Sequence, residues 1–132
     1  MRRHYSPVAE SCASVRRDLR AFLESCGVDA DATDVAVLVA NELASNVVDH
    51  VGTPFVVTVM LTAEAVRIEV EDGSASPPVV CPPDVHAARS RGLQLVEALT
   101  SDWTYARTAG GKTVCAEVPA VRSPRRSAWT GC

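Results

Sequence analysis

Residues 52–72 read GTPFVVTVMLTAEAVRIEVED, and within this stretch the hydrophobic repeat changes from that of a helix to that of a strand. Pro54 ends any preceding helix, because its ring nitrogen has no N–H and disfavours helical backbone in the residue before it. Residues 55–61 are rich in β-branched side chains, and residues 66–72 alternate apolar and charged ones. A short link joins the two runs. The stretch therefore predicts an antiparallel hairpin with one buried and one solvent-facing side.

Two helices are predicted before this hairpin. Over residues 8–26, apolar side chains recur every three or four positions, and Gly27 is a natural end for that helix. The next apolar repeat predicts a second helix, capped by Thr33 or Asp34 and running to about Val51.

After the hairpin, residues 73–89 contain four prolines and predict a loop long enough to serve as a lid over a site. A third helix is expected over residues 93–99. Two strands, at residues 103–106 and 113–118, form a second hairpin around Gly110 and Gly111. This order predicts an α+β fold, a two-layer sandwich in which about three helices cover one face of a mixed, mostly antiparallel sheet.

The length of 132 residues is that of one domain, which we expect to span residues 1–118, with residues 119–132 as a disordered tail. The net charge of −3 lacks the basic excess typical of proteins that bind nucleic acid directly. No uncharged apolar run is long enough to span a membrane, and no signal peptide is evident, so a cytoplasmic protein is expected. The five cysteines are widely spaced, which indicates reduced thiols rather than a zinc site.

Three groups of polar residues stand out from this framework. Glu42, Asn46 and His50 follow one another at intervals of four, so they share one side of the second helix or lie at its edge. Asp72 ends the alternating strand, a position typical of a ligand-binding carboxylate and also of a simple turn. Residues 90–93 open the third helix, where free N–H groups suit a phosphate and also suit an ordinary serine cap.

Together, in this order, the three groups resemble the ATP-binding core of the gyrase, Hsp90, histidine kinase and MutL superfamily, the Bergerat fold. Residues 41–50 look like its helical N box, and residues 70–74 look like its strand-end aspartate motif. Residues 91–96 look like its second glycine box, and residues 110–114 look like its closing strand. Within this superfamily, the short chain most resembles the stand-alone anti-sigma-factor serine kinases.

The resemblance implies a role for each matching residue. Asn46 would coordinate a Mg²⁺ ion that bridges the phosphates of ATP, and Glu42 would act as the general base toward the attacking hydroxyl. Asp72 would accept a hydrogen bond from the adenine amino group. The other positions implied to contact the nucleotide are His50, Gly73, Ser90, Arg91, Gly92, Leu93 and Thr113.

Three serines replace glycines of the family pattern, at positions 74, 76 and 90. Serine does not share the free access of glycine to positive φ, so these changes bear on how the loop closes. The resemblance implies a serine/threonine protein kinase that acts on a sigma factor or an anti-sigma antagonist in a partner-switching pathway, and it allows a homodimer. Two alternatives stay open: a nucleotide-gated module that sequesters such a partner without chemistry, and a degenerate relative that no longer binds ATP.

Overall fold

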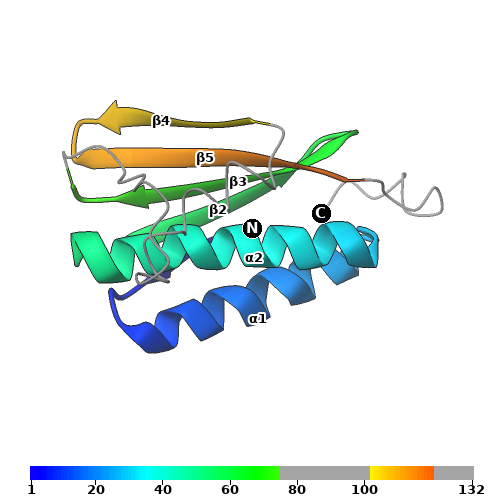
Figure 1. The fold of residues 1–132 in the computed structure, drawn as a ribbon, viewed down its shortest axis with the longest axis horizontal. Helices are drawn as coiled ribbons and strands as arrows, with labels where there is room; N and C mark the ends of the chain where they lie inside the picture. The colour runs from blue at the N-terminus through cyan, green and yellow to red at the C-terminus, as the bar shows by residue number, and fades with distance from the viewer. Residues whose placement is uncertain (75–101, 121–132) are drawn as a thin grey trace, which may run out of the picture.

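A five-stranded sheet packs one face against two helices in the computed structural model, which describes residues 1–74 and 102–120 (Figure 1). The elements in chain order are β1 (Arg2–Tyr5), α1 (Ala9–Ser25), α2 (Ala30–Asn46), the π-helical turn η1 (Val47–Val51), β2 (Phe55–Leu61), β3 (Ala65–Asp72), β4 (Asp102–Thr108) and β5 (Gly111–Pro119). The strand order is β1-β2-β3-β5-β4, and all neighbouring strands are antiparallel. The predicted α+β sandwich is confirmed. The expected third helix and most of the expected lid lie outside the described residues.

Strand β1 was not predicted, because RRHY carries no apolar alternation. It forms through its partner instead: Arg2 to Tyr5 pair with Thr58 to Phe55, and the amino group of Met1 donates to the carbonyl of Val59 at 3.1 Å. The ring of Tyr5 stacks on Phe55, and its hydroxyl donates to Asp18 of α1 at 2.9 Å. These contacts tie the edge of the sheet to the first helix.

Helix α2 begins earlier than the sequence predicted. The cap is Asp29, whose carboxylate accepts a hydrogen bond from the N–H of Ala32 at 2.9 Å, so the prediction of Thr33 or Asp34 was wrong. Gly27 adopts a φ of 77°, which turns the chain sharply after α1 and lets α2 start within a few residues. Thr33 is consequently buried inside α2.

The helical path of α2 continues to Val51, as predicted, but its last turn is wider than an α-helix. The N–H of Gly52 donates to the carbonyl of Val47 at 2.8 Å, a five-residue spacing, and Gly52 closes the turn with a φ of 72°. Because Pro54 cannot extend the hydrogen-bond ladder, the chain leaves the helix here and enters β2.

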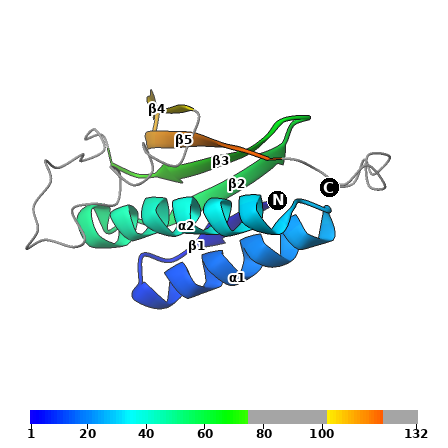
Figure 2. The same ribbon diagram turned by 45° about the vertical axis from the view of Figure 1, so that its right-hand side comes forward.

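The two helices run antiparallel and cover the same side of the sheet, as both views show (Figures 1 and 2). The buried face of the sheet carries alternate residues of β2, β3 and β5, and α2 packs against β3 and β5. The side chains that form this core include Val15, Leu19, Leu23, Val39, Leu43, Phe55, Val57, Ile68, Val70, Val114 and Ala116. The predicted burial of Val66, Ile68 and Val70 is confirmed.

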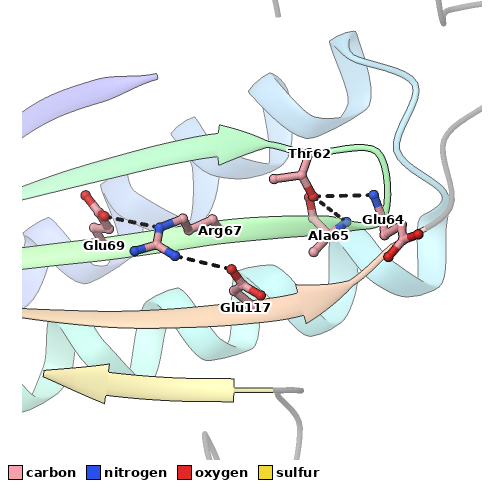
Figure 3. Close-up of polar contacts among 6 residues, drawn as sticks. All are labelled: Thr62, Glu64, Ala65, Arg67, Glu69 and Glu117. Atoms are coloured by element: carbon pink, nitrogen blue, oxygen red, sulfur yellow. Dashed lines mark hydrogen bonds and ion pairs between the residues drawn. The ribbon is translucent and has the colours of Figure 1, made fainter.

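The opposite face of the sheet is polar. Arg67 lies between two carboxylates, at 3.2 Å from Glu69 on its own strand and at 3.2 Å from Glu117 on β5 (Figure 3). At the β2–β3 turn, the hydroxyl of Thr62 accepts hydrogen bonds from the N–H groups of Glu64 and Ala65.

Among the described residues, no helix is long and apolar enough to cross a membrane.

Gly111, at the start of β5, allows a close approach to the backbone of β3. A Cβ atom at this position would meet the backbone oxygen of Asp72, whereas a Cβ on neighbouring Gly110 would meet nothing within 4 Å. Neither glycine has a positive φ. Glycine is therefore required at position 111 for space alone.

We predict that Gly111→Ala lowers the free energy of unfolding by more than about 2 kcal/mol, the range of a severe steric conflict in a core. Gly110→Ala, the matched control in the same turn, should stay within about 1 kcal/mol of the unsubstituted protein. Urea unfolding followed by circular dichroism measures both. Equal stability of the two variants would show that β3 and β5 are not packed this closely.

Candidate functional site

The candidate site is built where three chain segments end together. β3 ends at Asp72, β5 begins at Gly111, and α2 passes into η1 at the same end of the molecule, on the left in both views (Figures 1 and 2). The sheet contributes Asp72, which is paired in register with Lys112. The helix contributes Glu42, Asn46 and His50.

Asp72 and Lys112 form a buried ion pair. The ammonium nitrogen of Lys112 lies 3.1 Å from Oδ2 and 3.3 Å from Oδ1 of Asp72, and the two side chains are 2% and 1% exposed. Burying either charge alone would be costly, so each requires the other. The pair exists because the two residues face each other across β3 and β5 on the side of the sheet that carries the helices.

The turn after Asp72 is held by its own hydrogen bonds. Oδ1 of Asp72 accepts from the N–H of Ser74 at 2.8 Å, and the N–H of Gly73 donates to the hydroxyl of Thr53 at 2.9 Å. Thr53 lies in the connection between η1 and β2. The strand end is thereby fastened to the segment that follows α2, which fixes the sheet part of the site relative to the helix part.

Two of the predicted polar residues, Glu42 and Asn46, belong to α2 itself. Glu42 and Asn46 are half-buried and lie one turn apart, while the buried side chains of Leu43 and Val47 face the core. Asn46 stands at the junction with η1, and its side chain does not cap that turn. His50 lies on η1 and is exposed. The structure thus brings Glu42 and Asn46 to the same end of the molecule as Asp72.

Thr113 is placed differently from the other predicted residues. It pairs in register with Glu71 on the polar face of the sheet, because neighbouring residues in a strand point to opposite faces. Lys112, its neighbour, faces the other side of the sheet and lies beside Asp72. The alternation of Lys112 with buried Val114 and Ala116 was the signal that could have found it. The predicted residues Ser90, Arg91, Gly92 and Leu93 lie outside the described residues.

A separate pocket of about 310 Å³ lies between α1 and α2. Its polar lining includes Arg16, which donates to the side-chain oxygen of Asn41 at 2.6 Å, and Ser45, which lies 3.6 Å from the thiol of Cys12. None of the residues that line this pocket was predicted to bind nucleotide. Asn41 and Asn46 therefore have different environments on the same helix.

Comparisons with known proteins bear on the family and the fold of this chain. Residues 6–118 match the family model described as the histidine kinase-like ATPase domain. The crystal structure of the RsbU and RsbW domains of Rv1364c from Mycobacterium tuberculosis is similar to this chain, with a TM-score of 0.69 and 23% sequence identity over 93% of the chain. The match covers 33% of that longer protein chain, and at this identity it shows the fold alone. No curated protein sequence matches the chain.

The burial of the ion pair generates a stability prediction. Lys112→Met should lower the free energy of unfolding by about 3–5 kcal/mol, because it leaves the carboxylate of Asp72 buried without a counter-ion. Adding Asp72→Asn to Lys112→Met should restore a large part of that loss, since no unpaired charge remains.

The control is Arg20→Ala, which breaks an exposed ion pair of similar length, 2.8 Å from Arg20 to Asp34, on the helices. An exposed pair contributes about 0–1 kcal/mol. Thermal or urea unfolding of the three variants and the unsubstituted protein measures the difference. If Lys112→Met lowers the free energy of unfolding no more than Arg20→Ala does, the ion pair between Asp72 and Lys112 is not buried.

Proposed function

The chain belongs to the histidine kinase-like ATPase domain family, and on this premise we propose that it is an ATP-binding regulatory protein that phosphorylates a serine or threonine of a partner protein. The observation that carries the proposal is the placement of a buried carboxylate, at the end of β3, at the same end of the molecule as a half-buried carboxylate and amide on α2. The sheet residue suits recognition of a base, and the helix residues suit the metal, the phosphates and the reacting hydroxyl.

The residues present fit a nucleotide and Mg²⁺ by their chemistry. The carboxylate of Asp72 keeps acceptor capacity toward an amine, because only three hydrogen bonds or ion-pair contacts reach its two oxygens from described residues. Asn46 offers an amide oxygen, and Mg²⁺ takes few protein ligands beside phosphates and water. The ion, when bound with ATP, would neutralise charge on the phosphates.

Glu42 is the proposed general base. Its carboxylate lies one helical turn before Asn46, so a partner's hydroxyl that approaches the metal end of the site would come within its reach. Glu42 would take the hydroxyl proton while the oxygen attacks the terminal phosphate. Gly73, His50 and residues 90–93 would contact the rest of the nucleotide. We propose a subsidiary role for Thr113 at the rim, since it faces the other side of the sheet from Asp72.

The proposed pathway is partner switching, with a sigma factor or an anti-sigma antagonist as the protein partner. It rests on the resemblance of the motifs to stand-alone anti-sigma-factor kinases, and the similarity in fold to a structure that contains an RsbW domain supports it. A cytoplasmic location and a homodimer are parts of the same proposal.

A second candidate function is a sequestering module that binds ATP and a partner without phosphoryl transfer. The observation that favours it is Ser74, which stands where the family pattern has glycine and whose N–H is engaged by Asp72 at 2.8 Å. A backbone held in this way has less freedom to rearrange around the phosphates.

We predict that Asn46→Ala removes the Mg²⁺ enhancement of ATP binding. The affinity in Mg²⁺ should fall about tenfold, or about 1.4 kcal/mol, and the affinity in EDTA should stay unchanged. Asn41→Ala is the matched control, because Asn41 is an asparagine of the same helix that bonds to Arg16 instead. Calorimetric titration with ATP measures all three proteins. If both variants keep the full Mg²⁺ effect, Asn46 does not serve the metal.

For the transfer step, we predict that Glu42→Gln keeps ATP affinity and lowers phosphorylation of the partner by about 10²–10⁴, the usual contribution of a positioned base. Labelled ATP and candidate sigma-factor antagonists provide the assay. Transfer by the unsubstituted protein supports the kinase. Tight ATP binding and partner binding without transfer would establish the sequestering module instead.

A further inference from the structure

Lys112 is a buried cation with an unused donor. Its ammonium group has three N–H donors, and within residues 1–74 and 102–120 its hydrogen-bond and ion-pair partner is Asp72 alone. Two contacts, at 3.1 and 3.3 Å, engage at most two of the three donors. A buried donor without a partner costs free energy comparable to a lost hydrogen bond, so the third N–H is available to a ligand.

The carboxylate beside it has the complementary property. Oδ1 of Asp72 is contacted by both Ser74 and Lys112, whereas Oδ2 is contacted by Lys112 alone among the described residues. Each carboxylate oxygen can accept about two hydrogen bonds. Asp72 and Lys112 therefore present an acceptor and a donor side by side at the end of the sheet.

We infer that Lys112 reads the nucleotide base together with Asp72, an inference that rests on the proposed function. The amino group of adenine has a ring nitrogen that accepts hydrogen bonds on either side of it. This nitrogen is N1 on the Watson–Crick edge and N7 on the Hoogsteen edge. Asp72 accepts from the amine, and Lys112 Nζ donates to the adjacent ring nitrogen. Lys112 is thus a specificity-determining residue that adds a direct, charge-assisted hydrogen bond to the base.

The same pair rejects guanine. Guanine has a carbonyl oxygen where adenine has the amine, so its acceptor would face the carboxylate of Asp72. A site built to hydrogen-bond one group strongly rejects an analogue that leaves the buried polar groups of the site unpaired. The ion pair holds both groups in place before the ligand arrives, because the β3–β5 register and the neighbouring Gly111 fix their backbones.

The decisive experiment compares base analogues on the unsubstituted protein. Calorimetry is run with ATP, which has both ring acceptors, with 1-deaza-ATP, which lacks N1, and with 7-deaza-ATP, which lacks N7. We expect one of the two analogues to bind at least tenfold more weakly than ATP, which also identifies the edge that is read. Equal binding of all three nucleotides overturns the role of Lys112 and leaves the proposed function standing. Failure of ATP itself to bind overturns the proposed function and this inference with it.

Substitution then assigns the effect to Lys112. In Lys112→Gln, the ratio of affinities for ATP and the affected analogue should fall toward one, because the donor that senses the ring nitrogen is weakened. Arg67→Gln removes a cation from the polar face of β3 and should keep the full ratio. Circular dichroism checks that Lys112→Gln is folded. If the folded variant keeps the same ratio of affinities for ATP and the analogue as the unsubstituted protein, the inference is overturned. If that variant does not fold, the analogue comparison on the unsubstituted protein decides alone.

Discussion

The buried ion pair between Asp72 and Lys112 is the constraint around which the site end of this fold is organised. Two opposite charges survive in the core only because they face each other at about hydrogen-bonding distance. That contact requires the β3–β5 register, and the register in turn requires glycine at position 111. A one-residue slip of β5 would place Thr113 against Asp72 and move Lys112 to the polar face, so the charge pair and the hydrophobic pattern select the same alignment.

The helices serve the same end of the molecule. Helix α2 buries its apolar side on β3 and β5 while its polar edge carries Glu42 and Asn46 toward the strand end. The π-helical turn η1 then widens the helix and passes the chain through Thr53, which holds the turn after Asp72. In the proposed function, the sheet would recognise the base, and the helix would hold the metal and the phosphates. Sites built on regular elements keep their geometry more precisely than sites built on loops.

Much of this architecture could be predicted from the sequence, because the strong periodic patterns are local. The alternation in residues 66–72 and the apolar repeats of both helices predicted the elements and the buried faces that the structure has. Strand β1 could not be predicted, since it forms by pairing with a distant strand rather than by its own composition. The cap at Asp29 was missed because Thr33, one helical turn later, is also a residue type that commonly caps helices. The alternation of Lys112 with Val114 and Ala116 marks an inward-facing position, but its pairing with Asp72 follows only from the β3–β5 register, which the sequence does not give.

The central claim is that the Asp72–Lys112 pair forms the base-recognition end of a nucleotide site, and the side-chain nitrogen of Lys112 reports on it directly. Nitrogen-15 NMR of the Lys112 ammonium group, in the free protein and with saturating ATP, is the measurement. A buried, paired ammonium should give a signal protected from exchange with water, and ATP should shift that signal. An ammonium signal lost to rapid exchange in the free protein, or one that ATP leaves unchanged, would contradict the account.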